Sequence, residues 1–331
     1  GIEMFSSLRT LYVGGNPIFD LSGIETLTQL EHLNLSWLGG EGLGSAEWLG
    51  NMGNLNHLNV DGAGLTSAET ISTLTNLTFL WLGWNPGLDP SPISALTNLE
   101  TVSIAGLDLE SIDFVAPLIH VRGMHMDYNR ISDLTPLSGM AQLQYLYGWD
   151  NQISDLSPLV GMSQLRELSL YNNQVSDVSP LSELTNLSYL DLGNNQFSNI
   201  ASLTDLVNLR QLELGYNSLT DGSILSQFTQ LEGLGVPGNN LSDVLWASEL
   251  TNLSSLNLEQ NQISDVSPLC GLTQLNALNL RDNQIAFLNG TFDTWTNGTH
   301  IDLNQNPLFC SELDAAQANG NINIDFYTTC Y

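Results

Sequence analysis

Residues 143–164, LQYLYGWDNQISDLSPLVGMSQ, contain the 22-residue pattern that decides the fold. Large apolar residues stand at its first and fourth positions, an asparagine stands at the ninth, and the phrase ISDLSPL follows a turn. The same pattern recurs before and after this stretch along most of the chain. This copy differs at its sixth position, where Gly148 replaces a large apolar residue and is surrounded by Tyr145, Tyr147 and Trp149.

Fourteen copies of the pattern follow one another. Twelve of them begin with a leucine or valine that stands 22 or 25 residues after the first residue of the preceding copy. The copies begin at Leu8, Leu30, Leu55, Leu77, Leu99, Val121, Leu143, Leu165, Leu187, Leu209, Leu231, Leu253, Leu275 and Gly298. The asparagine recurs as Asn16, Asn85, Asn129, Asn151, Asn173, Asn195, Asn217, Asn239, Asn261, Asn283 and Asn306. A fixed period of 20–29 residues with this spacing is the leucine-rich repeat pattern.

The spacing within each copy predicts a short strand. Apolar residues at positions one, four and six point inward, and residues at positions three and five point outward. A single copy cannot bury its own apolar edge, so stability comes from stacking on neighbouring copies. The chain is therefore predicted to form an α/β repeat solenoid: a curved horseshoe with a parallel β-sheet on the concave face and short 3-10 or helical turns and loops on the convex face.

The convex side is predicted from four similar heptapeptides, ISDLTPL, ISDLSPL, VSDVSPL and ISDVSPL. Each contains an aspartate just before a short helical turn, where a carboxylate can accept hydrogen bonds from free N–H groups. A proline follows in the first turn, where the missing N–H has no cost. These aspartates, which recur wherever the turn recurs, are predicted to be caps rather than calcium ligands or catalytic groups: Asp133, Asp155, Asp177 and Asp265.

Two segments carry a resemblance to a known family: NNQVSDVSPLSELTNL (172–187) and NQISDVSPLCGLTQL (261–275). Both resemble the bacterial internalin-type leucine-rich repeat, and the likeness covers roughly residues 8–306. The resemblance implies a secreted or surface protein that binds a partner through the concave face. The residues after the repeats do not resemble the immunoglobulin-like segment of that family, so only the surface-binding role, and not host invasion, is carried over.

The chain is predicted to divide into a repeat array, residues 1–307, and a C-terminal cap, residues 308–331. Within the cap we expect a helical turn over 311–318 and a strand over 322–327, tied by a Cys310–Cys330 disulfide. A cap is needed because the apolar edge of the last repeat would otherwise face water. A disulfide indicates an oxidising, extracytoplasmic compartment.

The charge balance limits the possible partners. The chain has 35 acidic residues against 6 basic ones, all of them arginine, and a net charge of −29. Electrostatic repulsion therefore disfavours nucleic acid and anionic membrane surfaces as partners. No apolar run is long enough to span a bilayer, so no membrane insertion is expected. We predict a secreted or cell-surface protein that is monomeric.

The outward positions of the fourth to ninth copies are unusually aromatic. Tyrosine and tryptophan offer large rigid contact areas and are enriched at binding hot spots. Packing between neighbouring strands is the competing explanation, but it does not account for the grouping. We predict that a partner binds at Phe79, Trp81, Trp84, His125, Tyr128, Tyr145, Tyr147, Trp149, Arg166, Tyr171 and Tyr189.

Arginines recur at the second position of several copies. Arg122 follows Glu100 by one copy and Arg210 precedes Glu232 by one, so ion pairs between adjacent strands are expected for these two arginines. Arg166 stands between a glutamine and a serine in the same column, which makes it the better candidate for contacting a partner.

No sequence motif indicates catalysis. The chain lacks a nucleophile elbow, a phosphate-binding glycine loop and an HExxH motif. His32 and His57, with Asp61 nearby, make a poor zinc site because no third ligand stands at a familiar spacing. We therefore predict a binding protein that is not an enzyme, with no catalytic residues, metal or cofactor, and a protein as its ligand. A carbohydrate-binding module and a structural spacer of a larger adhesin remain alternatives.

Gly148 allows two interpretations. Its missing side chain leaves a gap in the apolar column, which the flexible Met124 or Met126 of the preceding copy could fill. Alternatively, Tyr147 and Trp149 sink toward the gap and form a shallow pocket.

Overall fold

The structure is a computed structural model of the 331-residue chain. It describes residues 1–18, 20–39, 42–293, 295, 298–318, 320, 322–327 and 329–330. The chain divides into two compact units, Gly1–Leu170 and Tyr171–Tyr331, which are described separately below.

The first unit contains eight three-residue strands that pair in parallel in sequence order. Equivalent repeat positions face each other, as in the pairing of Met124 with Leu146 and of Leu146 with Leu168. The strands are β1 (Thr10–Tyr12), β2 (His32–Asn34), β3 (His57–Asn59), β4 (Phe79–Trp81), β5 (Thr101–Ser103), β6 (Gly123–His125), β7 (Tyr145–Tyr147) and β8 (Glu167–Ser169). The 3-10 turns are η1 (Ile2–Met4), η2 (Ile24–Thr26), η3 (Glu47–Asn51), η4 (Ile71–Thr73), η5 (Ser91–Ala95), η6 (Asp113–Val115), η7 (Thr135–Leu137) and η8 (Ser157–Leu159).

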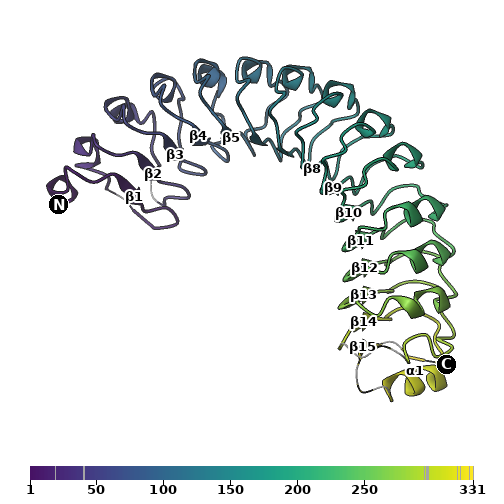
Figure 1. The fold of residues 1–331 in the computed structure, drawn as a ribbon. Helices are drawn as coiled ribbons and strands as arrows, with labels where there is room; N and C mark the ends of the chain where they lie inside the picture. Colours follow the sequence, from purple (N-terminus) through teal and green to yellow (C-terminus); the bar gives the residue numbers. More distant parts are fainter. Residues whose placement is uncertain are drawn as a thin grey trace. The chain divides into compact units, whose positions relative to one another are not determined.

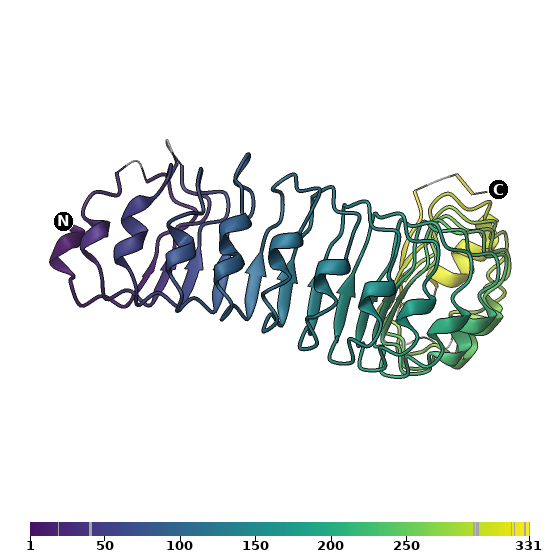
Figure 2. The same ribbon diagram turned by 90° about the horizontal axis from the view of Figure 1, so that it is seen from above.

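The second unit repeats the same alternation and ends in a short α-helix. Its strands are β9 (Tyr189–Asp191), β10 (Gln211–Glu213), β11 (Gly233–Gly235), β12 (Ser255–Asn257), β13 (Ala277–Asn279), β14 (His300–Asp302) and β15 (Asn323–Asp325). Its helical elements are η9 (Ser179–Leu181), η10 (Ala201–Leu203), η11 (Ser223–Gln227), η12 (Leu245–Glu249), η13 (Ser267–Gly271) and α1 (Cys310–Gln317). Within each unit the strands lie along one side and the helical turns along the other (Figure 1), and successive repeats follow one another as parallel coils (Figure 2).

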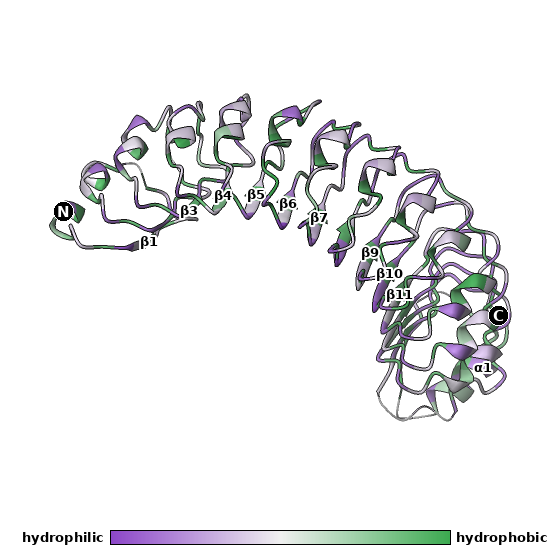
Figure 3. Ribbon diagram, turned by 45° about the horizontal axis from the view of Figure 1, so that its top comes forward, coloured by the Kyte–Doolittle hydropathy of each residue, from purple (hydrophilic) through white to green (hydrophobic). Residues whose placement is uncertain are grey.

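The predicted fold class is confirmed. Strands β1–β14 occupy positions three to five of the fourteen copies, and a 3-10 turn follows most of them. Apolar and polar segments alternate within each repeat (Figure 3), as inward and outward positions require. Among the described residues, no helix has the length and apolar character needed to cross a membrane.

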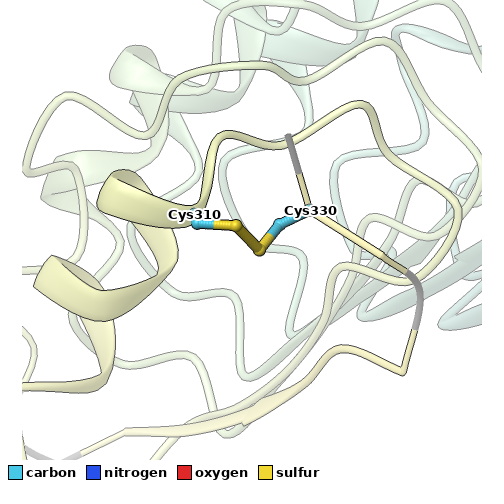
Figure 4. Close-up of a disulfide and its surroundings, with 2 residues drawn as sticks. All are labelled: Cys310 and Cys330. Atoms are coloured by element: carbon cyan, nitrogen blue, oxygen red, sulfur yellow. A yellow bond between two sulfur atoms is a disulfide. The ribbon is translucent and has the colours of Figure 1, made fainter.

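The predicted cap contains both expected elements. Helix α1 begins at Cys310, and β15 pairs in parallel with β14, so the cap adds one more strand to the sheet of the second unit. Cys310 and Cys330 form a disulfide (Figure 4). Residues 319, 321, 328 and 331 of the cap lie outside the described residues. The division into residues 1–307 and 308–331 stays a prediction.

The inward columns form the core. At positions one, four and six of the copies between the first and the last, the side chains are almost completely buried, as Leu143, Leu146 and Met126 show. A β-carbon added at Gly148 would lie 2.7 Å from Cε of Met126 and 3.3 Å from Cδ2 of Leu170. Met126 therefore fills the gap that the missing side chain leaves, which agrees with the first of the two interpretations.

The recurring asparagine joins each repeat to the one before it. The Asn129 side chain donates to the carbonyl oxygens of Met126 and Asp127 in its own repeat and of Ile104 in the preceding one, at 2.9–3.1 Å. Its Oδ1 accepts hydrogen bonds from the backbone N–H of Leu107 and Leu109. One buried amide thus bonds to five backbone groups where the chain leaves the strand, and some of these groups, such as the carbonyl of Asp127, have a further backbone partner.

The predicted aspartate caps are also present. Asp133, Asp155, Asp177 and Asp265 each accept a hydrogen bond, at 2.8–2.9 Å, from the backbone N–H two residues ahead. The N–H of Ser179 holds the pKa of Asp177 below its usual value. The pKa values of Asp133 and Asp265 are lowered in the same way, so the contribution of these three caps to stability is present at neutral pH and is lost as the pH falls through their lowered pKa values.

Replacing the repeat asparagine should be strongly destabilising. Asn129→Ala leaves buried N–H and C=O groups without partners, and we expect a loss of about 3 kcal/mol in the free energy of unfolding. Urea titration followed by circular dichroism measures the loss. Gln152→Ala, which removes an exposed side chain in the next repeat, is the matched control and should change the stability by less than about 0.5 kcal/mol.

The packing of Met126 against Gly148 can be tested with a double-mutant cycle. Gly148→Ala should destabilise the first unit by about 1–3 kcal/mol, because the added methyl group overlaps Met126. The double variant with Met126→Ala should lose less stability than the sum of the losses in the two single variants, since the two sites are in direct contact. Strictly additive effects in urea titrations would contradict this packing.

Candidate binding surface

A continuous row of rings crosses strands β2–β7 of the first unit. Adjacent rings lie at centroid distances of 5.5, 3.8, 5.1, 5.7 and 4.7 Å along the row. We call it the strand row; its members are His32, His57, Phe79, Trp81, His125 and Tyr147. All six side chains are half-buried, so each shows part of its ring to solvent.

A second row lies where the chain leaves the strands of the same unit. Its rings contact one another at centroid distances of 6.2, 5.1 and 4.3 Å. We call it the turn row; its members are Trp37, Trp84, Tyr128 and Trp149. Trp37 is 56% exposed and Tyr128 is 44% exposed, which is high for such large apolar side chains.

Three members of the turn row have a left-handed backbone. Trp37, Trp84 and Tyr128 stand at position eight of their repeats with φ of 52°, 56° and 53°. Glycine, asparagine and aspartate adopt this conformation most readily, and Asp150 and Asn172 hold the same position in other repeats. A bulky aromatic residue there costs about 1–2 kcal/mol. Backbone strain of this kind concentrates at functional sites.

Each tryptophan at position eight lies over a glycine of the next repeat. A β-carbon added at Gly62 would lie 2.5 Å from the Trp37 ring, and one added at Gly106 would lie 2.6 Å from the Trp84 ring. Any side chain at these glycines would displace the ring. The glycines therefore let each ring span a full repeat and reach the next member of the row.

Two aspartates are buried in the repeats that carry these rings. Asp61 and Asp127 stand at position seven and are 8% and 6% exposed. One carboxylate oxygen of each, together with Nε1 of Trp81, is buried without a hydrogen-bond partner. Burial raises the pKa of Asp61 to about 6 and that of Asp127 to about 7, and the negative charge of Asp150 contributes to the second value. Burial also lowers the pKa of His125, whose Nδ1 lies 3.8 Å from Oδ2 of Asp127.

The structure brings together seven of the predicted contact residues. Four stand in the strand row and three in the turn row: Phe79, Trp81, His125, Tyr147, Trp84, Tyr128 and Trp149. Tyr145 lies half-buried on β7, and the hydroxyl of Tyr147 donates a hydrogen bond to Glu167 on β8. Arg166 is exposed at the other end of its strand, at position two. His32, His57 and Trp37 also belong to the rows, although they are not among the predicted contact residues.

The expected ion pairs between strands are present. Arg122 lies 3.7 Å from Glu100, and Arg210 lies 3.8 Å from Glu232. Both arginines thus neutralise acids of the neighbouring repeat.

Tyr171 and Tyr189 belong to the second unit. Tyr171 borders an open hollow of about 220 Å³. Tyr216 and Pro237 are also among the residues that line it. Asp191 and Glu213 line the same hollow. Burial, together with the charge of Asp191, raises the pKa of Glu213 to about 7. Tyr189 stands on β9 and is half-buried.

The raised pKa of Asp127 predicts a pH-dependent stability. The folded state holds this proton more tightly than the unfolded state, so stability decreases as the pH rises from about 4 to about 7. Asp127→Asn removes the ionisation and should stabilise the first unit at pH 8 by up to about 4 kcal/mol. The gain should shrink steadily as the pH is lowered to 4.

Urea titrations of the wild type and the variant at pH 4, 6 and 8 measure this effect. Asp205→Asn makes the same change in net charge at an exposed residue of the second unit and serves as the control. A difference between the wild type and Asp127→Asn that is independent of pH would contradict the assignment.

Comparisons with known proteins agree with this architecture. A family model described as "Leucine Rich repeats (2 copies)" matches residues 148–183 and 163–205. No curated protein sequence matches the chain. Among solved structures, a leucine-rich repeat protein of Leptospira interrogans matches 98% of this chain and 97% of its own at 20% identity, with a TM-score of 0.73. A plant peptide hormone receptor, RGFR1 in complex with RGF2, matches 98% and 64% at 20% identity, with a TM-score of 0.63. These two likenesses show the fold alone.

The internalin inlF of Listeria monocytogenes strain 4b F2365 is more similar in sequence. It is 31% identical over 98% of this chain and 88% of its own, with a TM-score of 0.80. Leucine-rich repeat proteins are typically binding modules without catalytic activity. Because this identity extends over nearly the whole repeat array, the chain belongs to the internalin family of leucine-rich repeat proteins.

Proposed function

We propose that the chain is an extracytoplasmic recognition module that binds a partner protein on the strand and turn rows of its first unit and catalyses no reaction. The observation that carries the proposal is the turn row. Trp37, Trp84 and Tyr128 occupy left-handed positions that glycine or asparagine would occupy at lower cost. Three repeats thus have, on one surface, an aromatic residue that lowers the stability of the fold. Contact with a partner explains why these residues are there.

The size of the surface favours a protein over a small ligand. The strand row extends from β2 to β7, which corresponds to roughly 25 Å at the usual strand spacing. Rigid aromatic side chains that show part of their surface to solvent are typical anchors of protein interfaces. The plant receptor with the same fold binds a peptide hormone, which gives further support.

Two findings support an extracytoplasmic location. The Cys310–Cys330 disulfide is of a kind that persists in oxidising compartments. Membership of the internalin family agrees with secretion or display at the cell surface. The net charge of −29 makes nucleic acid and anionic membranes unfavourable partners.

A glycan is the second candidate ligand, and the hollow of the second unit favours it. Tyr171 and Tyr216 offer ring faces on which a sugar can stack, while Asp191 and Glu213 can accept hydrogen bonds from its hydroxyl groups. The hollow has about the volume of a single sugar ring, so it would hold one residue of a glycan rather than a protein segment.

Two sets of substitutions separate these possibilities. The first, Tyr128→Ala with Tyr147→Ala and Trp149→Ala, removes the end of both rows; the second, Tyr171→Ala with Tyr216→Ala, opens the hollow. Immobilised wild type and variants are used to capture extracellular proteins, and affinities for the captured protein are then measured with purified components. The same chains are applied to a glycan array.

We expect the first set to weaken binding of the captured protein by at least about 30-fold, because interface anchors contribute about 2 kcal/mol or more. The second set should leave that affinity unchanged. Glycan binding that is lost only with the second set would favour the carbohydrate candidate. A protein bound equally by the wild type and both variants would reject the proposed surface and would favour a structural spacer.

A further inference from the structure

Buried polar atoms without partners are concentrated on the proposed surface. Among the described residues, four buried side-chain atoms lack a hydrogen-bond partner, and three of them lie in the repeats that carry the aromatic rows: Oδ1 of Asp61, Nε1 of Trp81 and Oδ1 of Asp127. Such atoms are uncommon in folded proteins because each retains the full cost of its desolvation. Their grouping indicates that part of the polar surroundings of these atoms comes from outside the chain.

Asp127 stands between the two rows. On one side, Nδ1 of His125 in the strand row lies 3.8 Å from its Oδ2. On the other side, Tyr128 and Trp149 of the turn row pack edge to face at 4.3 Å. Trp149 lies near enough to Asp127 to offset part of the rise of its pKa. Asp127 itself is 6% exposed, so its carboxyl group is largely removed from water.

The surroundings of Asp127 do not neutralise its negative charge. Burial lowers the pKa of His125, so the neutral imidazole is favoured at neutral pH, and Asp150 adds a second negative charge nearby. The two arginines of the same copy are paired elsewhere: Arg122 lies beside Glu100, and Arg130 lies 2.6 Å from Asp108. A buried carboxylate without a countercharge is unstable, and an external cation would remove that cost.

We propose that Asp127, together with the rings of His125, Tyr128 and Trp149, forms a subsite for an arginine side chain of the partner protein. A planar guanidinium stacks on aromatic faces and donates two parallel N–H bonds to one carboxylate. Tyr128 is 44% exposed, and exposed side chains change rotamer rapidly, so this ring can adjust to an incoming side chain. The inference rests on the proposed function, and it adds that the contact segment of the partner is basic.

Arginine fits this subsite better than a sugar does. Sugar hydroxyl groups can donate hydrogen bonds to the carboxylate, but they are neutral and leave its charge uncompensated. A basic segment is also attracted over a longer range by the net charge of −29.

Capped pentapeptides test the subsite directly. The probe is Gly-Gly-Arg-Gly-Gly, and the control is the same peptide with citrulline, a neutral isostere of arginine. Each is titrated to millimolar concentrations into the full chain at pH 8 while the indole N–H signals are followed by NMR. The signal of Trp149 is assigned with a Trp149→Phe variant.

We expect the arginine peptide to shift the Trp149 signal and to bind at least about tenfold more tightly than the citrulline peptide. Asp127→Asn should abolish this preference, whereas Asp205→Asn, which changes the net charge equally, should retain it. The folding of Asp127→Asn is verified independently by its urea titration.

Equal binding of the two peptides, or no shift at Trp149 with either, would overturn the arginine subsite. The subsite would also be rejected if Asp127→Asn and Asp205→Asn lost the preference for the arginine peptide equally, because that result would reflect the net charge of the chain alone. The two proposals can fail separately. If the aromatic substitutions still abolish capture of a protein while the peptides bind equally, the proposed function stands and the arginine subsite is rejected.

Discussion

The structure depends on one repeated interaction: a buried asparagine amide that bonds to the backbone of two consecutive repeats. Asn129 satisfies carbonyl groups in its own repeat and both carbonyl and N–H groups in the repeat before it. Asn85 in the first unit and Asn239 in the second bond in the same way, so within each unit such an asparagine holds its repeat at a fixed position relative to the one before. Equivalent side chains then stand in columns, and a column of aromatic residues becomes a continuous surface.

This division of roles leaves the outward positions free to serve binding. Stability comes from the inward leucines, the asparagines and the aspartate caps, so the residues on the exposed face are not needed for folding. On the first unit some of these residues even oppose stability, as the left-handed backbone of Trp84 and the buried carboxyl of Asp127 show. A surface that reduces stability in two physically different ways is better explained by a ligand than by packing.

Much of the fold could be predicted from the sequence because the repeat spacing directly reflects the geometry of a strand. The positions of β1–β14, the aspartate caps and the ion pair of Arg122 with Glu100 all follow from that spacing. The turn row could be predicted only in part, since the spacing alone does not reveal that the backbone at position eight is left-handed. The pairing of Trp37 with Gly62 and of Trp84 with Gly106 is a usable signal. The burial of Asp127 was not predictable, because the repeat spacing does not show how deeply a residue at position seven lies between neighbouring repeats.

The alternation of aromatic residue and glycine at position eight gives the first three members of the turn row a period of two repeats. From Trp37 through Gly62, Trp84 and Gly106 to Tyr128, one aromatic residue stands for every two strands, and each ring reaches across the intervening glycine to the next at 6.2 and 5.1 Å. Aromatic residues and glycines therefore alternate between successive repeats in this part of the row. Inserting or deleting a single repeat within it would place two rings, or two glycines, side by side, and would disrupt the row while leaving the solenoid intact. Between Trp37 and Tyr128, repeats can be gained or lost without changing the order of rings and glycines at position eight only in pairs.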